Sequence, residues 1–183
     1  QRNPDPLEEG HDVVISIAQE LADSQFVAQV IGQIYSAPFA SPAYLQRHGV
    51  PASPAALNEH RCLRLLDPMY SDQWQFHDAA GEQGVLPGPT FQSNVAESMV
   101  NASEAGMGVS LVPFYAATRP LSEGRLLRLL PAYRLRERNV YALYPSRRFL
   151  DAKVRTWVDF LQAELPQVFA AHEAVMNDPR HWA

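Results

Sequence analysis

The segment from Ser93 to Pro113 holds the residues whose types and spacing best suit ligand binding. Polar Ser93 and Asn94 stand directly before a predicted helix, Val95–Ala105, and Glu97 follows Asn94 at the spacing of a capping box. The free N–H groups and the dipole of a helix N-terminus favour negative charge. A glycine turn and a predicted buried strand follow. An open α/β sheet holds small ligands at such helix starts and strand ends, so the segment predicts binding of a carboxylate or another anion.

The sequence Glu59–Cys62 suggests a different chemistry, because a thiolate at Cys62 beside the imidazole of His60 can act as a nucleophile. The two side chains share a strand face only if the strand already begins at His60, and no third orienting group is evident. No catalytic residue is therefore predicted. His48, His60 and Cys62 match no zinc spacing, so we predict neither a metal site nor a cofactor.

Composition and charge are those of a globular protein: the 183 residues are 46% hydrophobic and 19% charged. The single cysteine excludes an intramolecular disulfide and favours a reducing, cytoplasmic setting. A net charge of −5 argues against nucleic-acid binding by this segment alone. No apolar run approaches the roughly 18 residues of a membrane span, and the polar start Gln1–Gly10 does not resemble a signal peptide.

Basic residues are concentrated between positions 125 and 155, for which we predict a solvated face, with a site facing an acidic partner as the alternative. They are Arg125, Arg128, Arg134, Arg136, Arg138, Arg147, Arg148, Lys153 and Arg155.

The N-terminal elements are predicted from the hydrophobic pattern and from the capping and breaking residues at their ends. Asp12–Ala18 is a β-branched run typical of a strand buried on both faces. Asp23–Ile31 has apolar residues at helical spacing but is too short to assign. Gln33–Ala40 is predicted as an extended segment, bent or at a sheet edge near Pro38. A helix follows, capped by Ser41 and ended by Gly49.

Later elements are predicted in the same way. The helix Val95–Ala105 should place Val95, Met99, Ala102 and Ala105 on one apolar face. A second helix, Asp151–Leu165, should bury Trp157 in its stripe, and Pro166 should end or kink it, with helical extension to about Met176. Trp74 is also predicted to lie in the core. Strands are predicted at Cys62–Leu66, Trp74–Phe76, within Leu121–Leu130 and at Asn139–Pro145, and a hairpin at Gly81–Gly88.

Several of these segments, in this order, resemble the effector-binding domain of LysR-type transcriptional regulators over about residues 7–165. They are Asp12–Ile15, Ala40–Leu45, His60–Leu63, Trp74–Phe76, Asn94–Pro113, and Tyr144–Pro145 followed by Val154–Leu161.

The resemblance implies an α/β fold of two Rossmann-like lobes joined by two crossover strands, as in periplasmic solute-binding proteins. Lobe one would hold residues 1–38 and 140–183, and lobe two residues 39–139. The crossovers would lie at Tyr35–Phe39 and Arg138–Tyr141. Family members carry a helix-turn-helix and a first β-α-β of lobe one upstream of Leu7–Gly10, so we expect lobe one to be incomplete here.

The resemblance also implies a function: sensing a small effector, anionic or aromatic, in the cleft between the lobes of a bacterial regulator. DNA would be bound only through the helix-turn-helix, and the full-length protein would be a homodimer or tetramer with no membrane partner. Lobe-two helix Val95–Ala105 would face the first helix of lobe one. A solute-binding protein of a transport system remains the alternative.

The residues expected to line the cleft come from strand ends, a crossover and helix starts. Ser16 stands where many family members have arginine, which implies a different effector. Ser93 and Asn94 as simple caps, and Phe39 and Phe114 as core residues, remain open alternatives. The expected ligand-binding residues are Ser16, Ile17, Ser36, Pro38, Phe39, Ser93, Asn94, Val95, Val112, Pro113 and Phe114.

Overall fold

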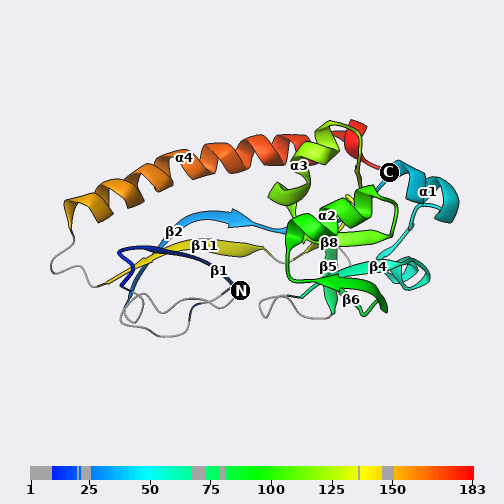
Figure 1. Cartoon of the computed structure of the whole chain (residues 1–183), viewed down its shortest axis with the longest axis horizontal. Helices are drawn as coiled ribbons and strands as arrows, with labels where there is room; N and C mark the ends of the chain where they lie inside the picture. The colour runs from blue at the N-terminus through cyan, green and yellow to red at the C-terminus, as the bar shows by residue number, and fades with distance from the viewer. Residues whose placement is uncertain are drawn as a thin grey trace. The chain divides into compact units, whose positions relative to one another are not determined.

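The chain folds into two compact units, which Figure 1 shows in a computed structural model. The structure describes residues 10–19, 21, 26–66, 73–78, 81–135, 137–145 and 151–183. Unit 1 comprises Gln1–Ile34 and Glu137–Ala171, and unit 2 comprises Tyr35–Arg136 and His172–Ala183. The chain therefore passes from one unit to the other three times, the third time inside its last helix.

Unit 1 contains a three-stranded antiparallel sheet in the order β1-β11-β2. The strands are β1 (Val14–Ala18), β2 (Val27–Ile34) and β11 (Arg138–Tyr144). The first and last confirm the prediction, whereas the untyped segment ending at Ile31 contributes to a strand. The expectation that β1 is buried on both faces is wrong. Ile15 is 48% exposed, whereas Val14 and Ser16, on the other face of β1, are buried.

Helix α4 (Ala152–Met176) accompanies this sheet and continues through Pro166 to Met176, which confirms the predicted helical extension. Pro166 lacks the backbone donor that the carbonyl of Gln162 accepts from in a regular helix. Next to that carbonyl, Gln167 Nε2 donates to Ala163 O at 3.1 Å. The ring of Phe169 packs closely on Gly32, and a Cβ at this position would lie 2.2 Å from the ring. Tertiary packing beyond the proline thus offsets its local cost.

Unit 2 is built on a mixed five-stranded sheet in the order β7-β4-β8-β3-β9, with a smaller antiparallel sheet β10-β5-β6. Strand β4 runs parallel to β7 and β8, and β3 runs antiparallel to β8 and β9. The strands are β3 (Ser36–Ala40), β4 (Cys62–Leu65), β5 (Trp74–Asp78), β6 (Gly81–Val85), β7 (Pro89–Ser93), β8 (Val109–Pro113), β9 (Leu127–Arg128) and β10 (Arg134–Leu135).

The helices of unit 2 begin and end largely at the predicted residues. Helix α1 (Pro42–His48) is capped by Ser41, whose Oγ accepts from Tyr44 N, and it ends at Gly49 with a φ of 81°. The short 3-10 helix η1 (Pro54–Glu59) follows. Helix α2 (Ala96–Glu104) ends in a Schellman arrangement, with Met107 N donating to Ala102 O.

Three predictions in this unit are wrong. Val95 and Ala105 are exposed rather than on the buried face of α2, which instead buries Met99, Val100, Ala102 and Ser103. The Gly81–Gly88 hairpin does not form, because β6 pairs with β5. A further helix, α3 (Phe114–Ser122), starts directly after Pro113 and was not expected.

The C-terminal residues differ from the expected lobe assignment, because residues 172–183 pack in unit 2. Met176 is fully buried, and the guanidinium of Arg128 donates to its carbonyl at 3.0 Å. The chain then forms the 3-10 helix η3 (Pro179–His181), and Ala183 N donates to Arg128 O. These contacts hold the end of α4 against β9.

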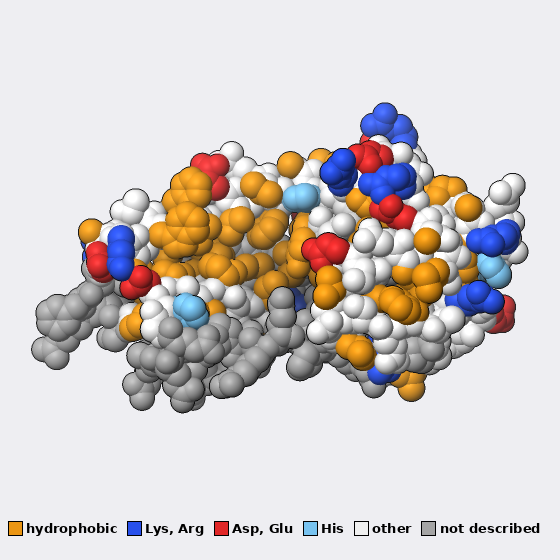
Figure 2. Space-filling model, in the orientation of Figure 1, with side chains coloured by type: hydrophobic (Ala, Val, Ile, Leu, Met, Phe, Trp, Pro, Cys, Tyr) orange, Lys and Arg blue, Asp and Glu red, His pale blue; other side chains and the backbone are white. Residues whose placement is uncertain are grey.

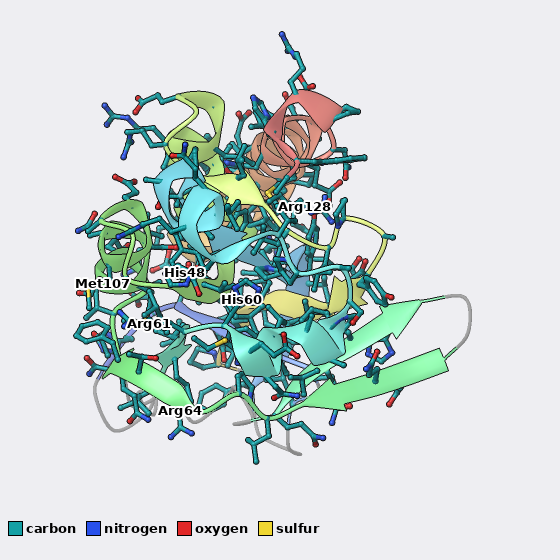
Figure 3. The ribbon with its side chains drawn as sticks, turned by 90° about the vertical axis from the view of Figure 1, so that its right-hand side faces the viewer. His48, His60, Arg61, Arg64, Met107 and Arg128 are labelled. Carbon is teal, nitrogen blue, oxygen red and sulfur yellow. The ribbon has the colours of Figure 1, made fainter. Side chains whose placement is uncertain are left out.

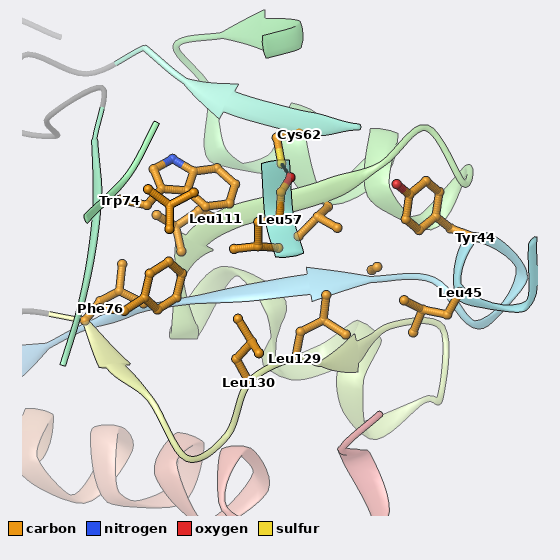
Figure 4. Packing of buried hydrophobic residues seen from close by; sticks show 13 residues of the cluster. Tyr44, Leu45, Leu57, Cys62, Trp74, Phe76, Leu111, Leu129 and Leu130 are labelled. Atoms are coloured by element: carbon orange, nitrogen blue, oxygen red, sulfur yellow. Dashed lines mark hydrogen bonds between the residues drawn. The ribbon is translucent and has the colours of Figure 1, made fainter. Parts of the chain in front are cut away.

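A hydrophobic core of unit 2 lies between its two sheets (Figure 4). Trp74 is buried there as predicted, whereas Trp157 of α4 is 49% exposed, contrary to the prediction. The cluster comprises Ala40, Tyr44, Leu45, Leu57, Cys62, Trp74, Phe76, Val85, Val109, Leu111, Leu129, Leu130 and Leu135.

Candidate functional site

The candidate site is the edge of the large sheet at which β7, β4 and β8 end. These three strands are parallel, with β4 between the other two, so α2 and α3 both begin at this edge. Antiparallel β3 begins there, because Ser36 pairs with Pro113. The structure thus brings Ser36, Ser93 and Pro113 to one edge of unit 2, as the sequence predicts for strand ends.

The start of α2 has no side-chain cap. Val95 occupies the cap position, and Asn94 is exposed, so the predicted capping by Asn94 is wrong. Ser93 Oγ accepts from Val95 N at 3.2 Å and braces the turn instead. Among the described residues, no acceptor takes the N–H groups of Ala96 and Glu97. These two N–H donors and the positive end of the α2 dipole therefore face outward at the edge where β7 ends.

The start of α3 resembles that of α2. Pro113 is its cap residue and provides no side-chain hydrogen bond, while Phe114 N donates to Tyr35 O at 3.1 Å. The Tyr35 and Phe114 rings lie 5.0 Å apart, and Tyr115 is partly exposed. Tyr35 and Tyr115 were not predicted as site residues. The helical spacing of Phe114, Ala117, Thr118 and Leu121, all buried, is the signal that identifies α3.

Several predicted site residues at or next to this edge are buried. Phe39, Val112 and Phe114 are fully buried, and Ser36 and Pro38 are buried as well. The structure therefore places Phe39 and Phe114 in the core, in agreement with the alternative left open for them. Their role at this edge is to support the backbone of Pro113 and the start of α3.

Two predicted residues, Ser16 and Ile17, belong to unit 1. Ser16 is buried on β1 opposite Tyr141, and Ile17 is half-buried opposite Val140. They stay predictions for the ligand site, separate from the edge of unit 2.

The Cys62 and His60 side chains do not form a nucleophilic pair. Cys62 is 1% exposed, its thiol donates to Leu57 O, and burial raises its pKa to about 12. His60 Nδ1 lies 3.2 Å from Tyr44 Oη, which also accepts from Arg61 N. Figure 3 labels His60 and Arg61 among the side chains of unit 2. Burial and the neighbouring His48 lower the pKa of His60. The thiol is thus protonated at neutral pH, which does not favour covalent chemistry.

Within the described ranges, no three His, Cys, Asp or Glu side chains gather in a way that could hold a metal ion. The same ranges contain no helix of the length and apolarity needed to cross a bilayer.

The basic stretch is largely engaged with the protein itself. Arg125 forms ion pairs with Glu104 and Glu123, and Lys153 Nζ lies 2.8 Å from Asp12 Oδ2. Arg128 is buried. Arg136, Arg147 and Arg148 lie outside the described residues. These contacts favour the structural interpretation of the stretch over an acidic partner.

Comparisons with known proteins point to one family. Residues 1–166 match the model of the LysR substrate binding domain. The chain is 32% identical over 162 residues to the Escherichia coli HTH-type transcriptional regulator YhjC, a match covering 87% of this chain and 54% of that one. It is 29% identical over 169 residues to the E. coli regulator DmlR, covering 92% and 53%. The chain spans about half the length of the curated relatives it matches.

Solved structures agree with these matches. The full-length Vibrio cholerae virulence activator AphB superposes with a TM-score of 0.77 at 26% identity, over 89% of this chain and 55% of that one. The regulatory domain of CrgA from Neisseria meningitidis gives 0.75 at 28% identity, over 87% and 78%. The likeness confirms the predicted α/β fold class with two lobes.

Proposed function

The chain belongs to the LysR-type transcriptional regulators, and on that premise we propose that it senses a small anionic effector at the carboxyl edge of the unit 2 sheet. The relatives are transcriptional regulators, which favours a sensor over both an enzyme and a transport protein. DNA binding by a helix-turn-helix and assembly into dimers or tetramers would be properties of the longer regulator. Because that regulator acts on bacterial DNA, we place it in the cytoplasm.

One observation carries the choice of ligand: two helices start at the same sheet edge without side-chain caps. The N–H groups of Ala96 and Glu97 are available to an acceptor. A carboxylate satisfies such donors and interacts favourably with both helix dipoles. Tyr35 and Tyr115 provide aromatic surface beside the start of α3. An acid with an apolar or aromatic body therefore fits this edge best.

Binding would act through a shift in populations. An effector stabilises the conformations of the regulator in which its contacts are better, by the difference in its binding free energies. The starts of α2 and α3 directly follow β7 and β8, so ligand contacts there act on the strands that organise unit 2. The signal to DNA would pass through parts of the regulator outside this chain.

Thermal unfolding of the chain with a panel of small aliphatic and aromatic acids tests the proposal, with the corresponding amides as neutral controls. A ligand at 100 times its dissociation constant adds roughly 2.7 kcal/mol to the free energy of unfolding. We expect one class of acids to raise the midpoint and its amides to have little effect. Equal shifts with acid and amide, or no shift with any acid, would contradict an anion site.

The variant Ala96→Pro locates the site. Proline is well tolerated at the first helical position, and Val95 already has the extended φ of −119° and ψ of 118° that a following proline requires. The change removes one of the two free donors, and we expect a loss of about 1.5–3 kcal/mol in acid binding. Ala152→Pro, at the first position of α4, is the matched control and should retain binding. Unchanged affinity in Ala96→Pro would exclude the start of α2.

A further inference from the structure

The last segment of the chain, residues 172–183, packs in unit 2 although it lies outside residues 1–166, which match the family model. It comprises the end of α4 and the 3-10 helix η3, and we call it the strap. Met176 in its middle is fully buried, so the strap is part of the folded unit. The family match assigns it no role, and its contacts are therefore the guide to what it does.

The strap contacts the large sheet of unit 2 at β9, the last strand in the order β7-β4-β8-β3-β9. Arg128 of β9, labelled in Figure 3, is 4% exposed. Its Nη1 donates to Met176 O at 3.0 Å and to Asn177 Oδ1 at 3.2 Å. Trp182 forms a parallel bridge with Arg128, and Ala183 N donates to Arg128 O at 3.1 Å. The strap thus covers part of the sheet edge and provides acceptors for a buried cation.

A second contact point lies on α3. His172 Nδ1 is 2.8 Å from Thr118 Oγ1, and that hydroxyl donates to Phe114 O at 2.9 Å. A hydroxyl has one hydrogen, so Thr118 accepts from His172, whose Nδ1 carries the ring proton. The His172 ring also lies 6.0 Å from the ring of Phe114. The first turn of the strap is therefore fixed to α3.

Between these two contact points the strap does not fill the space against α3. A hollow of about 470 Å³ lies there, lined by Ser122 at the end of α3 and by the strap residues Ala174, Val175, Asp178, Arg180 and His181. Figure 2 shows acidic and basic side chains at the surface over the end of α3 and η3. The ion pairs Arg119–Glu123 and Asp178–Arg180 each lie within one of the two segments and do not join them.

We propose that the strap opens and closes as one cooperative unit while the rest of unit 2 stays folded, and that it thereby controls access to α3 and to the edge of β9 together. Segments held by few contacts open locally at a lower free energy than the whole protein unfolds. Opening exposes Arg128 and Thr118 to water at the same time, because both contact points belong to one continuous segment. The proposal does not depend on the effector site at the starts of α2 and α3.

Hydrogen exchange of the 183-residue chain, followed by NMR, measures these openings. The hydrogens on Ala183 N and His172 Nδ1 each report on one contact point, and Val109 N, bonded to Arg61 O, reports on the centre of the sheet. We expect Ala183 and His172 to exchange through one common opening that depends little on urea. Val109 should exchange only through global unfolding, which depends strongly on urea.

Each contact point is then changed and the other is read. Arg128→Met removes two hydrogen bonds from a charged donor, and we expect it to raise the opening constant at His172 Nδ1 at least about tenfold. His172→Leu removes one neutral hydrogen bond and should raise the opening constant at Ala183 N about three- to tenfold. Circular dichroism checks that each variant is folded.

Two controls separate strap opening from a general loss of stability. Arg119→Met removes an exposed arginine from α3 and should leave both reporters unchanged. Leu57→Ala weakens the core in the closed and the open strap alike, so it should speed exchange at Val109 and not at the strap.

Three outcomes overturn the proposal. If each variant affects only its own contact point, the strap does not open as one unit. If Ala183 and His172 exchange only with Val109 and with the same urea dependence, the strap has no opening of its own. If they exchange without protection, the strap is not closed in solution. None of these measurements involves an acid, so failure here is distinguishable from failure of the proposed effector site.

Discussion

Unit 2 and unit 1 enclose their buried apolar side chains in different ways. Unit 2 encloses thirteen core residues between two sheets, and its last residues close over β9. In its described residues, unit 1 has three strands and one long helix, and its buried apolar side chains lie between that one sheet and the helix. A sheet of three strands covered by one helix is near the lower limit of independent stability. We therefore expect unit 2 to carry most of the stability of the chain.

The largest test compares one leucine from each unit. Leu57 is fully buried in the middle of the unit 2 cluster (Figure 4), and Leu161 of α4 is 8% exposed. Leu57→Ala should cost about 3–5 kcal/mol and Leu161→Ala about 2, because a cavity in a closed core relaxes less. Urea unfolding followed by circular dichroism and by tryptophan fluorescence gives both values.

The volume-conserving Leu57→Met is the control and should cost less than about 1.5 kcal/mol. If the units unfold in separate steps, each alanine variant should move only the step of its own unit. Equal losses in the two alanine variants would show that the burial difference does not translate into a stability difference.

Two glycines, one in each unit, test how well each unit tolerates an added methyl group. A Cβ at Gly108 in unit 2 would lie 2.3 Å from the carbonyl oxygen of Arg61, which already accepts from Val109 N. A Cβ at Gly32 in unit 1 would lie 2.2 Å from the ring of Phe169. Backbone in a sheet cannot move away, but a ring on a helix can. We expect Gly108→Ala to cost about 1–3 kcal/mol and Gly32→Ala less than about 1.

Thermal unfolding of both variants measures the difference. Combining Gly32→Ala with Phe169→Leu should remove the contact and leave only the loss of the ring. A cost for Gly32→Ala as large as that for Gly108→Ala would mean that unit 1 is packed as rigidly as unit 2.

Elements whose ends are marked by capping residues, proline or glycine were predictable from the sequence. Helix α1 begins at Ser41–Pro42 and ends at Gly49, and those residues specify its ends wherever it packs. Helix α4 was predicted to end or kink at Pro166, a local signal, with helical extension to about Met176, and it reaches Met176 without a break. It continues because Phe169, His172 and Met176 are held by Gly32, Thr118 and Arg128, all distant in sequence. No local pattern contains that information.

The candidate site likewise has features that the local sequence predicts and features that depend on distant contacts. Strand ends and helix starts at Ser93 and Pro113 are local features, and the structure brings them to one edge. Burial of Phe114 depends on His172 and Tyr35, whose rings lie 6.0 and 5.0 Å from it. One of these neighbours lies far before Phe114 in the sequence and the other far after it. The sequence alone therefore could not decide whether Phe114 is a core residue or a ligand contact.

The smallest expected effect is a pH dependence of stability caused by His60 in unit 2. Burial first, and then His48, lower the pKa of His60, while Glu59 opposes them. Its other close neighbours are Tyr44 and Arg61. The unfolded chain therefore takes up a proton below its unfolded pKa of about 6.5 before the folded chain does. Stability contributed by the neutral imidazole is fully present above that pH and is lost as pH falls through the lowered pKa.

Urea unfolding at pH 7.5 and at pH 5 checks this expectation in the wild type and in His60→Gln, which keeps an acceptor for Tyr44. We expect the wild type to lose more stability on acidification than the variant does, by a small margin because His60 is only partly buried. His11→Gln removes an exposed imidazole from unit 1 and should retain the wild-type slope. If His60→Gln loses as much unfolding free energy between pH 7.5 and pH 5 as the wild type does, acid sensitivity does not distinguish the two units. His60 would then be more accessible to water than its packing indicates.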